Sequence, residues 1–187
     1  MPATSRWLRL TALPLLPAIL SATVLLTAGT ADARTADASA DASTAEASAT
    51  DASNTTRATR QRRERRIQHA VQVARDQIGD PYAYGAAGPG AFDCSGLTMY
   101  SYARAGIRLP RSSDAQASAV RRVKRSNMRR GDLMFFHSGG SVYHLGIFLK
   151  RRGGRAIILH SSSPGRPVQR DPVWTNSWFA GTLRSGR

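Results

Sequence analysis

Cys94 is the only cysteine in the 187-residue chain, and it lies between Asp93 and Ser95-Gly96. The local pattern predicts that a helix begins at Cys94, where a thiol faces unpaired backbone N–H groups and the positive end of the helix dipole. Both effects favour the thiolate, and the same N–H groups could hold the oxyanion formed when sulfur attacks a carbonyl. Cysteine is more often a small buried hydrophobic residue, but polar and small neighbours disfavour that role here. We therefore expect a nucleophilic thiol.

A thiol nucleophile needs a base that takes up its proton, and His144 and His160 are candidates for that base. They lie in two successive apolar segments joined by a short connection of Arg and Gly. A three-residue connection with Gly153 in the left-handed conformation would pair Lys150 with Gly154 and bring the two histidines directly opposite each other on one face. A connection of two or four residues would, without a bulge, put them on opposite faces. We expect the first arrangement, with one imidazole as the base and the other orienting it by accepting its second ring proton.

Two paired histidines on a sheet can also bind zinc. The chain has no second cysteine and no closely spaced His-x-x-His or Cys-x-x-Cys pair, which disfavours a zinc site. Acid–base chemistry is therefore the preferred interpretation, and zinc binding is the alternative. We expect neither a metal ion nor a cofactor.

Helical patterns precede strand patterns along the chain. Residues 67–79 place apolar side chains on one helical face, and a second helix is predicted from Cys94, with Asp93 as its N-cap, to a stop at Gly106. Helices followed by antiparallel strands indicate an α+β domain over residues 67–187, with the N-terminal helices packed on one face of the sheet. The predicted strands occupy residues 132–136, 143–150, 155–161 and 178–184.

Three aromatic residues near the C-terminus have two interpretations. Trp174, Trp178 and Phe179 could stack on sugars. Such a cluster more often closes the end of a small sheet, and this is the preferred interpretation.

Residues 1–33 have the features of a secretory signal peptide. Arg6 and Arg9 precede an uncharged, mostly apolar stretch over residues 10–28, and an Ala-x-Ala sequence ends at Ala33. A retained membrane anchor is the alternative, because the stretch approaches the length that spans a bilayer. We expect cleavage after Ala33, no retained membrane span, and a secreted protein that is extracellular or associated with the cell wall.

Residues 34–66 are predicted to form a disordered tether. Residues 34–59 are almost entirely Ala, Ser, Thr and Asp, which offer nothing large to bury. Residues 57–66 carry six arginines and one glutamate. This arginine-rich run could bind an anionic polymer, but a solvated linker or the polar start of a helix is the preferred interpretation.

The charge balance bears on partners rather than on the fold. The chain has 27 Lys and Arg against 12 Asp and Glu, a net charge of +15, and residues 67–187 have 18 basic and 6 acidic residues, hence +12. Attraction to polyanions is therefore expected from the whole surface. The chain lacks the interleaved aromatic residues and the basic helix of a nucleic-acid reader, so we expect no specific nucleic-acid partner. We expect a monomer.

Taken in order, the motifs of the predicted domain resemble those of the NlpC/P60 family of papain-like cell-wall cysteine peptidases. A single piece such as Asp-Cys-Ser-Gly would be weak, but the ordered set spans nearly all of the domain with the right gaps. Gly85-Ala86-Ala87 departs from the Gly-Gly that the family often has. The resembling segments are residues 80–85, 92–96, 109–113, 130–133, 144–148 and His160.

The resemblance implies a papain-like α+β fold and a peptidase that acts on peptidoglycan stem peptides through a thioester. Family members typically cleave the bond between γ-linked D-Glu and the following diamino acid. The +12 charge of residues 67–187 suggests a separate hypothesis, that the surface associates with anionic wall polymers. A thioester-forming amidase or acyltransferase, or a non-catalytic wall-binding protein, is the alternative. The resemblance implies these roles: Cys94 the nucleophile, His144 the base, His160 the orienting residue, Tyr82 a group that positions the substrate or the oxyanion, and Asp93, Ser95 and Arg111 the residues that recognise the free amino end of the stem peptide.

Overall fold

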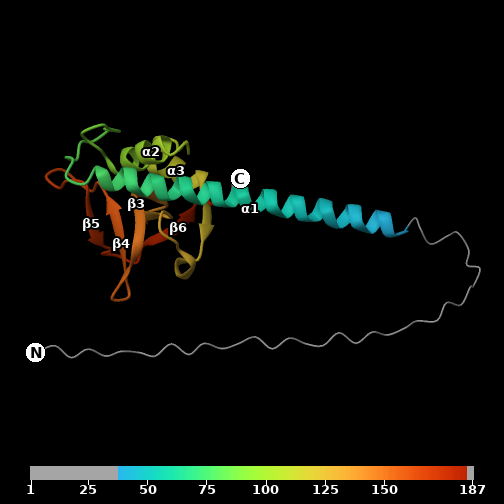
Figure 1. The fold of residues 1–187 in the computed structure, drawn as a ribbon. Coiled ribbons are helices and arrows are strands. Elements are labelled where there is room, and N and C mark those ends of the chain that lie inside the picture. The colour runs from blue at the N-terminus through green and yellow to red at the C-terminus, as the bar shows by residue number, and fades with distance from the viewer. Residues whose placement is uncertain (1–37, 185–187) are drawn as a thin grey trace, which may run out of the picture. The chain divides into compact units, whose positions relative to one another are not determined.

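A six-stranded antiparallel sheet lies at the centre of the fold, and helices cover one of its faces (Figure 1). The computed structural model describes residues 38–184, with side chains from residue 51 onward. The predicted signal peptide, residues 1–33, lies outside the described residues. Contacts within the chain define two units, residues 1–43 and 44–187, and the sheet belongs to the second. Within residues 38–184, no helix combines the length and the hydropathy that crossing a membrane requires.

The helices come first along the chain and the strands follow. The helices are α1 (Ala38–Asp76), α2 (Cys94–Arg104) and α3 (Ser113–Ala119), and a short 3₁₀ turn, η1 (Arg125–Asn127), connects the first two strands. The strands are β1 (Arg121–Val123), β2 (Leu133–Ser138), β3 (Ser141–Arg152), β4 (Arg155–His160), β5 (Gln169–Pro172) and β6 (Trp178–Thr182), in the spatial order β1-β6-β2-β3-β4-β5. The predicted α+β architecture is confirmed.

Both faces of the central strands are buried. Leu145 of β3 packs with residues of α1 and α2 in the larger core, whereas Met134 and Phe136 of β2 belong to a second core on the other face. Burial on both faces explains why β2, β3 and β4 read as nearly continuous apolar runs rather than as alternating patterns. His144 pairs with Phe136 across β2 and β3, and so lies on the face of the second core.

The two strands that the sequence did not predict are the edge strands of the sheet. β1 reads Arg-Arg-Val and β5 reads Gln-Arg-Asp-Pro, so neither has the apolar character on which strand prediction relies. Charged side chains and proline are typical of edge strands, where they discourage pairing with a further chain.

Helix α1 corrects the predicted tether. From Ala38 onward the segment expected to be disordered is helical; alanines recur along it, and residues 57–66 are rich in Arg, Gln and Glu, which are strong helix formers. The end of the arginine-rich run is also anchored to the domain: the Glu64 carboxylate accepts a hydrogen bond from Arg184 Nε at 2.6 Å, and Arg63 Nε donates to the Leu183 carbonyl at 2.6 Å. The run is thus part of a helix whose packing begins before residue 67, as the polar-helix interpretation held.

Candidate active site

The motif Asp93-Cys94-Ser95-Gly96 begins helix α2 as predicted. Asp93 is the N-cap, since its Oδ1 accepts the backbone N–H of Gly96 at 2.7 Å. Gly96 lets the preceding loop lie directly on the first turn, because a Cβ at this position would be 2.1 Å from the Ala86 carbonyl oxygen. The loop therefore half-buries Cys94 at the helix N-terminus.

The Cys94 sulfur lies beside strand β3. It accepts backbone N–H groups of its own first turn and the N–H of Leu145, the residue that follows His144. A second contact joins the segment before α2 to the end of β4, because Ser161 donates its hydroxyl to the Phe92 carbonyl at 2.7 Å. Helix α2 is thereby held against the strands that carry both predicted histidines.

The thiol is not ionised by the helix terminus, contrary to the sequence-based expectation. Burial raises the pKa of the Cys94 thiol, the Asp93 carboxylate raises it further, and the N–H groups around the sulfur do not compensate. Burial, together with the neighbouring His160, lowers the pKa of His144 to about 3. At neutral pH the free protein therefore holds a neutral thiol and a neutral imidazole.

The turn between β3 and β4 differs from the predicted three-residue connection. Arg152 pairs with Arg155 around a two-residue turn, and both turn residues, Gly153 and Gly154, have positive φ, at 53° and 75°. This matches the tight hairpin turn that places two residues at positive φ. The expected pairing of Lys150 with Gly154 is therefore wrong.

A β-bulge restores the common face of the two histidines. The register shifts at Leu149, which is an extra residue on β3, and beyond it Ile147 pairs with Leu159. This register places His160 diagonally from His144, two positions away from the directly opposed pair that the sequence predicted. The prediction of one shared face is confirmed, because a diagonal step of two residues keeps side chains on the same side of a sheet.

A hydrogen-bonded chain runs from His144 through His160 to Asp171. The distance from His144 Nε2 to His160 Nδ1 is 2.8 Å, and that from His160 Nε2 to Asp171 Oδ2 is 3.0 Å. Burial raises the pKa of Asp171, but hydrogen bonds from Gln169 and His160 outweigh it and hold that pKa below its usual value. Asp171 is thus a carboxylate, which can only accept.

The direction of these bonds determines both histidine tautomers. Because Asp171 only accepts, His160 carries its proton on Nε2, and burial lowers the pKa of His160, so its Nδ1 is an unprotonated acceptor. His144 must then donate from Nε2, which leaves the lone pair on its Nδ1. The lone pair on His144 Nδ1 is therefore the one nitrogen acceptor of the pair that lies outside this chain of hydrogen bonds.

Aromatic side chains shield the histidine pair from water. Only 6% of His144 and 2% of His160 is exposed. The Trp174 ring lies 5.7 Å from the His144 ring and 5.6 Å from the His160 ring, and it stacks on Phe136 at 4.6 Å. This enclosure accounts for the low basicity of both imidazoles.

The residues predicted to bind substrate also come together. Arg111 donates to both carboxylate oxygens of Asp93 and, at 2.8 Å, to the Ser95 hydroxyl. Although burial alone raises the pKa of Asp93, the hydrogen bonds from Arg111 and Gly96 lower it overall. Tyr82 lies near this group, and burial followed by the proximity of Cys94 and Asp93 raises its pKa.

Asp171 is the site residue that sequence reasoning missed. It lies in β5, opposite Ile158 and diagonally from His160, whose own partner is Gln169. Its strand is too polar to be recognised from its pattern. The sequence nevertheless offers one indication of a carboxylate partner for the histidines, because Asp171 is the only acidic residue after Asp132.

Comparison with known proteins agrees with this architecture. Residues 79–187 match the model of the NlpC/P60 family. The chain belongs to the NlpC/P60 family. One NlpC/P60 relative, the "Probable endopeptidase Rv2190c" of Mycobacterium tuberculosis, is 45% identical over 103 residues, covering 55% of this chain and 25% of the relative. The "Probable endopeptidase p60" of Listeria monocytogenes is 35% identical over 117 residues, covering 63% and 23%. The chain therefore spans about a quarter of the length of these two relatives.

Solved NlpC/P60 structures have the same fold. The peptidoglycan hydrolase RipB from Mycobacterium tuberculosis superimposes with a TM-score of 0.56 at 28% identity, covering 64% of this chain and 65% of RipB. The NlpC/p60 domain of the peptidoglycan hydrolase SagA gives a TM-score of 0.55 at 34% identity, covering 63% and 98%. These similarities confirm the family and the fold that the sequence motifs predicted.

The NlpC/P60 site has the parts that acyl transfer requires: a thiol, a base of fixed tautomer and backbone N–H groups around the sulfur. Among the described residues, no group of three or more His, Cys, Asp or Glu side chains is arranged to hold a metal ion. His144 Nε2 and His160 Nδ1 are hydrogen-bonded to each other, and His160 Nε2 is bonded to Asp171.

Proposed function

We propose that this protein is a cysteine endopeptidase that hydrolyses peptidoglycan stem peptides. The observation that carries the proposal is the chain of hydrogen bonds from His144 through His160 to Asp171, with the Cys94 sulfur bonded to the N–H of the residue next to His144. The similarity to a probable endopeptidase supports the reaction, and the similarity to the peptidoglycan hydrolases RipB and SagA supports the substrate class.

In the first half of the reaction the Cys94 sulfur attacks the carbonyl carbon of the scissile bond while His144 Nδ1 takes the thiol proton. Because the free pair is neutral, proton transfer and attack occur together rather than from a stored thiolate. The imidazolium that forms is stabilised through His160 by the Asp171 charge, and backbone N–H groups near the sulfur stabilise the oxyanion. The C–N bond then breaks, His144 returns its proton to the leaving amine, and a thioester remains on Cys94.

In the second half water replaces the amine. His144 Nδ1 takes a proton from a water molecule as its oxygen attacks the thioester carbonyl, and the C–S bond breaks. The released sulfur recovers the proton from His144, which restores the neutral pair. One carboxylic acid and one amine are formed for each water consumed.

Substrate recognition uses the cluster beside the thiol. We propose that Asp93 and Ser95 bind the free amino end of the stem peptide and that Arg111 and Tyr82 contribute to the same subsite. Arg111 occupies both Asp93 oxygens, but its side chain is 40% exposed and can swing outward when an ammonium group arrives. The bond assigned to the enzyme is the one between γ-linked D-Glu and the diamino acid.

Mass spectrometry of fragments released from purified peptidoglycan tests this function directly. The expected fragments end in D-Glu or begin with the free amine of the diamino acid. Cys94→Ala and His144→Ala should release none, whereas His69→Ala, which removes an exposed histidine of α1, should leave release unchanged. Iodoacetamide should inactivate the protein and a chelator should not.

Other outcomes would refute specific parts of the proposal. Fragment release by Cys94→Ala would refute the nucleophile, and inactivation by the chelator alone would favour the zinc alternative. Products that carry an added amine in place of water would identify an acyltransferase, and cleavage of another bond would refute the bond assignment.

We propose further that residues 1–33 direct secretion and that the mature protein begins at Arg34. Support comes from the basic start, the apolar stretch and the Ala-x-Ala sequence. N-terminal sequencing of protein recovered from culture medium and cell wall should give Arg34 as the first residue. Recovery of the intact N-terminus in the membrane fraction would instead indicate a retained anchor.

A further inference from the structure

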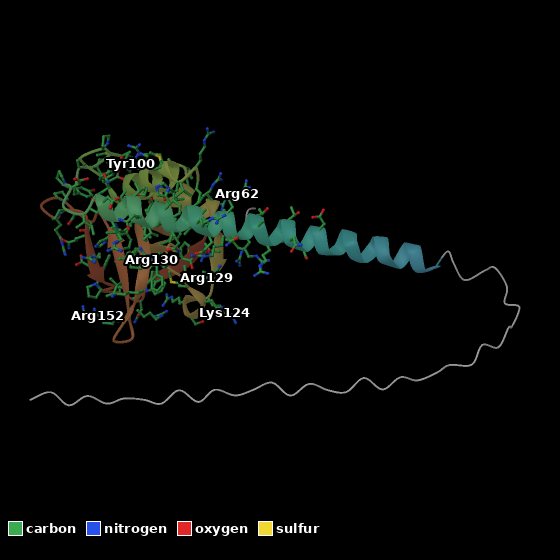
Figure 2. All side chains as sticks on the ribbon, viewed as in Figure 1. Arg62, Tyr100, Lys124, Arg129, Arg130 and Arg152 are labelled. Carbon is green, nitrogen blue, oxygen red and sulfur yellow. The ribbon has the colours of Figure 1, made fainter. Side chains whose placement is uncertain are left out.

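One end of the sheet carries a concentration of positive charge. Residues 115–170 contain twelve Lys and Arg but a single acid, Asp132, which is buried in an ion pair with Arg184; one of the twelve, Arg166, pairs with Asp171. Exposed basic residues of this set lie on and around η1 and on the hairpin of β3 and β4. Figure 2 labels Lys124 and Arg152 at this end of the sheet.

A pocket opens at this end, between η1, the β3–β4 hairpin and the segment from β5 to β6. Its volume is about 440 Å³. Its lining combines cations with aromatic rings: Arg125, Arg151, Arg155, Trp174 and Trp178. A pocket of this size accommodates a small ligand or a short segment of a polymer.

Backbone carbonyls, not carboxylates, hold the three arginines in place. Arg151 donates to the Arg125 carbonyl at 2.8 Å and Arg155 to the Val173 carbonyl at 3.1 Å. Arg125 donates to the Asn176 carbonyl at 2.7 Å, and its guanidinium lies 4.2 Å from the centre of a tryptophan ring. Within residues 51–184, no carboxylate forms an ion pair with any of the three. Each guanidinium has five N–H donors, so positioned charge and donors remain for a ligand.

Trp174 connects this pocket to the active site. Its ring is half exposed in the pocket lining, unlike buried Trp178, and it is the same ring that covers His144 and His160. Trp178 is thus packed in the second core, whereas half of the Trp174 surface remains exposed.

We propose that this pocket binds a phosphodiester-linked glycopolymer of the cell wall, with a phosphate on the arginines and a sugar or polyol against Trp174. Guanidinium groups match phosphate geometry with paired N–H donors, and aromatic rings stack on the apolar faces of sugars. The proposal rests on the proposed function, because a wall polymer is attached to the substrate of the adjoining site. Binding there would hold the enzyme on polymer-bearing peptidoglycan, which a charge spread over the whole surface would not do selectively.

The test compares two charge-matched double variants of the full-length chain, both with Cys94→Ala so that walls stay intact. Arg151→Ala with Arg155→Ala removes pocket charge, and Arg75→Ala with Arg108→Ala removes the same charge at exposed positions elsewhere. Sedimentation with purified walls gives Kd at several salt concentrations. The pocket variant should bind about tenfold to a hundredfold more weakly. The slope of the logarithm of the binding constant against the logarithm of salt concentration should become shallower by about 1–2. The control should change less than twofold.

Two further arms identify the ligand. On walls stripped of phosphodiester polymers with hydrofluoric acid, the two variants should have the same Kd. Tighter binding of the pocket to single-stranded DNA than to the wall polymer would overturn the proposal in favour of a nucleic-acid site. Equal weakening of the two variants, or an unchanged difference on stripped walls, would also overturn it. Binding is measured without hydrolysis, so failure of the peptidase proposal would not alter these results; equal melting temperatures verify that the variants fold.

Discussion

Replacing Asp171 with Asn tests the hydrogen-bonded chain with the least disturbance. Asn keeps an acceptor oxygen for His160 Nε2, which lies 3.0 Å from Asp171 Oδ2, but removes the negative charge. A hydrogen bond to a charged group contributes about 1.5–3 kcal/mol and a neutral one about 0.5–1.5 kcal/mol. The transition state in which His144 holds the thiol proton should therefore lose about 1–1.5 kcal/mol, the difference between those two values. That loss corresponds to a decrease in kcat/KM of about 5- to 12-fold.

The assay is kcat/KM on a soluble stem peptide as a function of pH. Asp171 raises the pKa of His160 against the larger effect of burial, so Asp171→Asn should make the histidine pair less basic. The acid limb of the profile should then move to lower pH. Asp76→Asn, at an exposed position of α1, serves as the matched control. Wild-type kcat/KM together with an unmoved acid limb in Asp171→Asn would refute the role of Asp171 in orienting the pair.

Three further substitutions test the packing and the electrostatics of the domain. His144→Gln should reduce the loss of stability in acid. The pKa of His144 is about 3 in the folded protein and 6.5 ordinarily, so between these pH values only the unfolded chain binds the proton. The free energy of unfolding of the wild type therefore falls by about 1.4 kcal/mol for each pH unit from 6.5 down to 3. Urea unfolding at pH 6, 5 and 4 measures this slope, and equal slopes would contradict the neutral burial. Gly96→Ala should lower stability by about 1–3 kcal/mol, because the new methyl group would lie 2.1 Å from a carbonyl oxygen; an unchanged melting temperature would mean that the loop moves aside freely. Glu64→Gln should cost about 1–2 kcal/mol by weakening the bond to buried Arg184, and denaturant unfolding that shows no loss would mean that α1 is not anchored there.

Local sequence patterns predicted the elements of the site better than their electrostatics. Asp93 as an N-cap, the helix start at Cys94 and four of the strands follow from short-range chemistry, and all are observed. The ionisation of the thiol does not follow from such chemistry. It depends on how much of the loop and of β3 covers the sulfur, and burial outweighs the helix terminus.

Long-range geometry explains the remaining differences. Two consecutive glycines, Gly153 and Gly154, allow several turn types, so the sequence alone could not distinguish a two-residue turn with a bulge from a three-residue loop. Asp171 reaches His160 only through the pairing of β4 with β5, a polar edge strand without a recognisable pattern. The helix over residues 38–56 was missed because that stretch has no large apolar side chains and many Ser, Thr and Asp residues, which are typical of disorder.

Because of the bulge at Leu149, the effect of a one-residue deletion in this hairpin depends on which residue is lost. Loss of Leu149 would convert β3 into a regular strand and keep both imidazoles on one side, since the bulged residue has no partner on β4. Loss of Ile157 from β4, with Leu149 still unpaired, would instead turn His160 to the opposite face of the sheet from His144. Two chains with the same number of residues between these histidines can therefore differ in whether the two imidazoles lie on one face and can bond to each other. The residue count has meaning only together with the position of the unpaired residue.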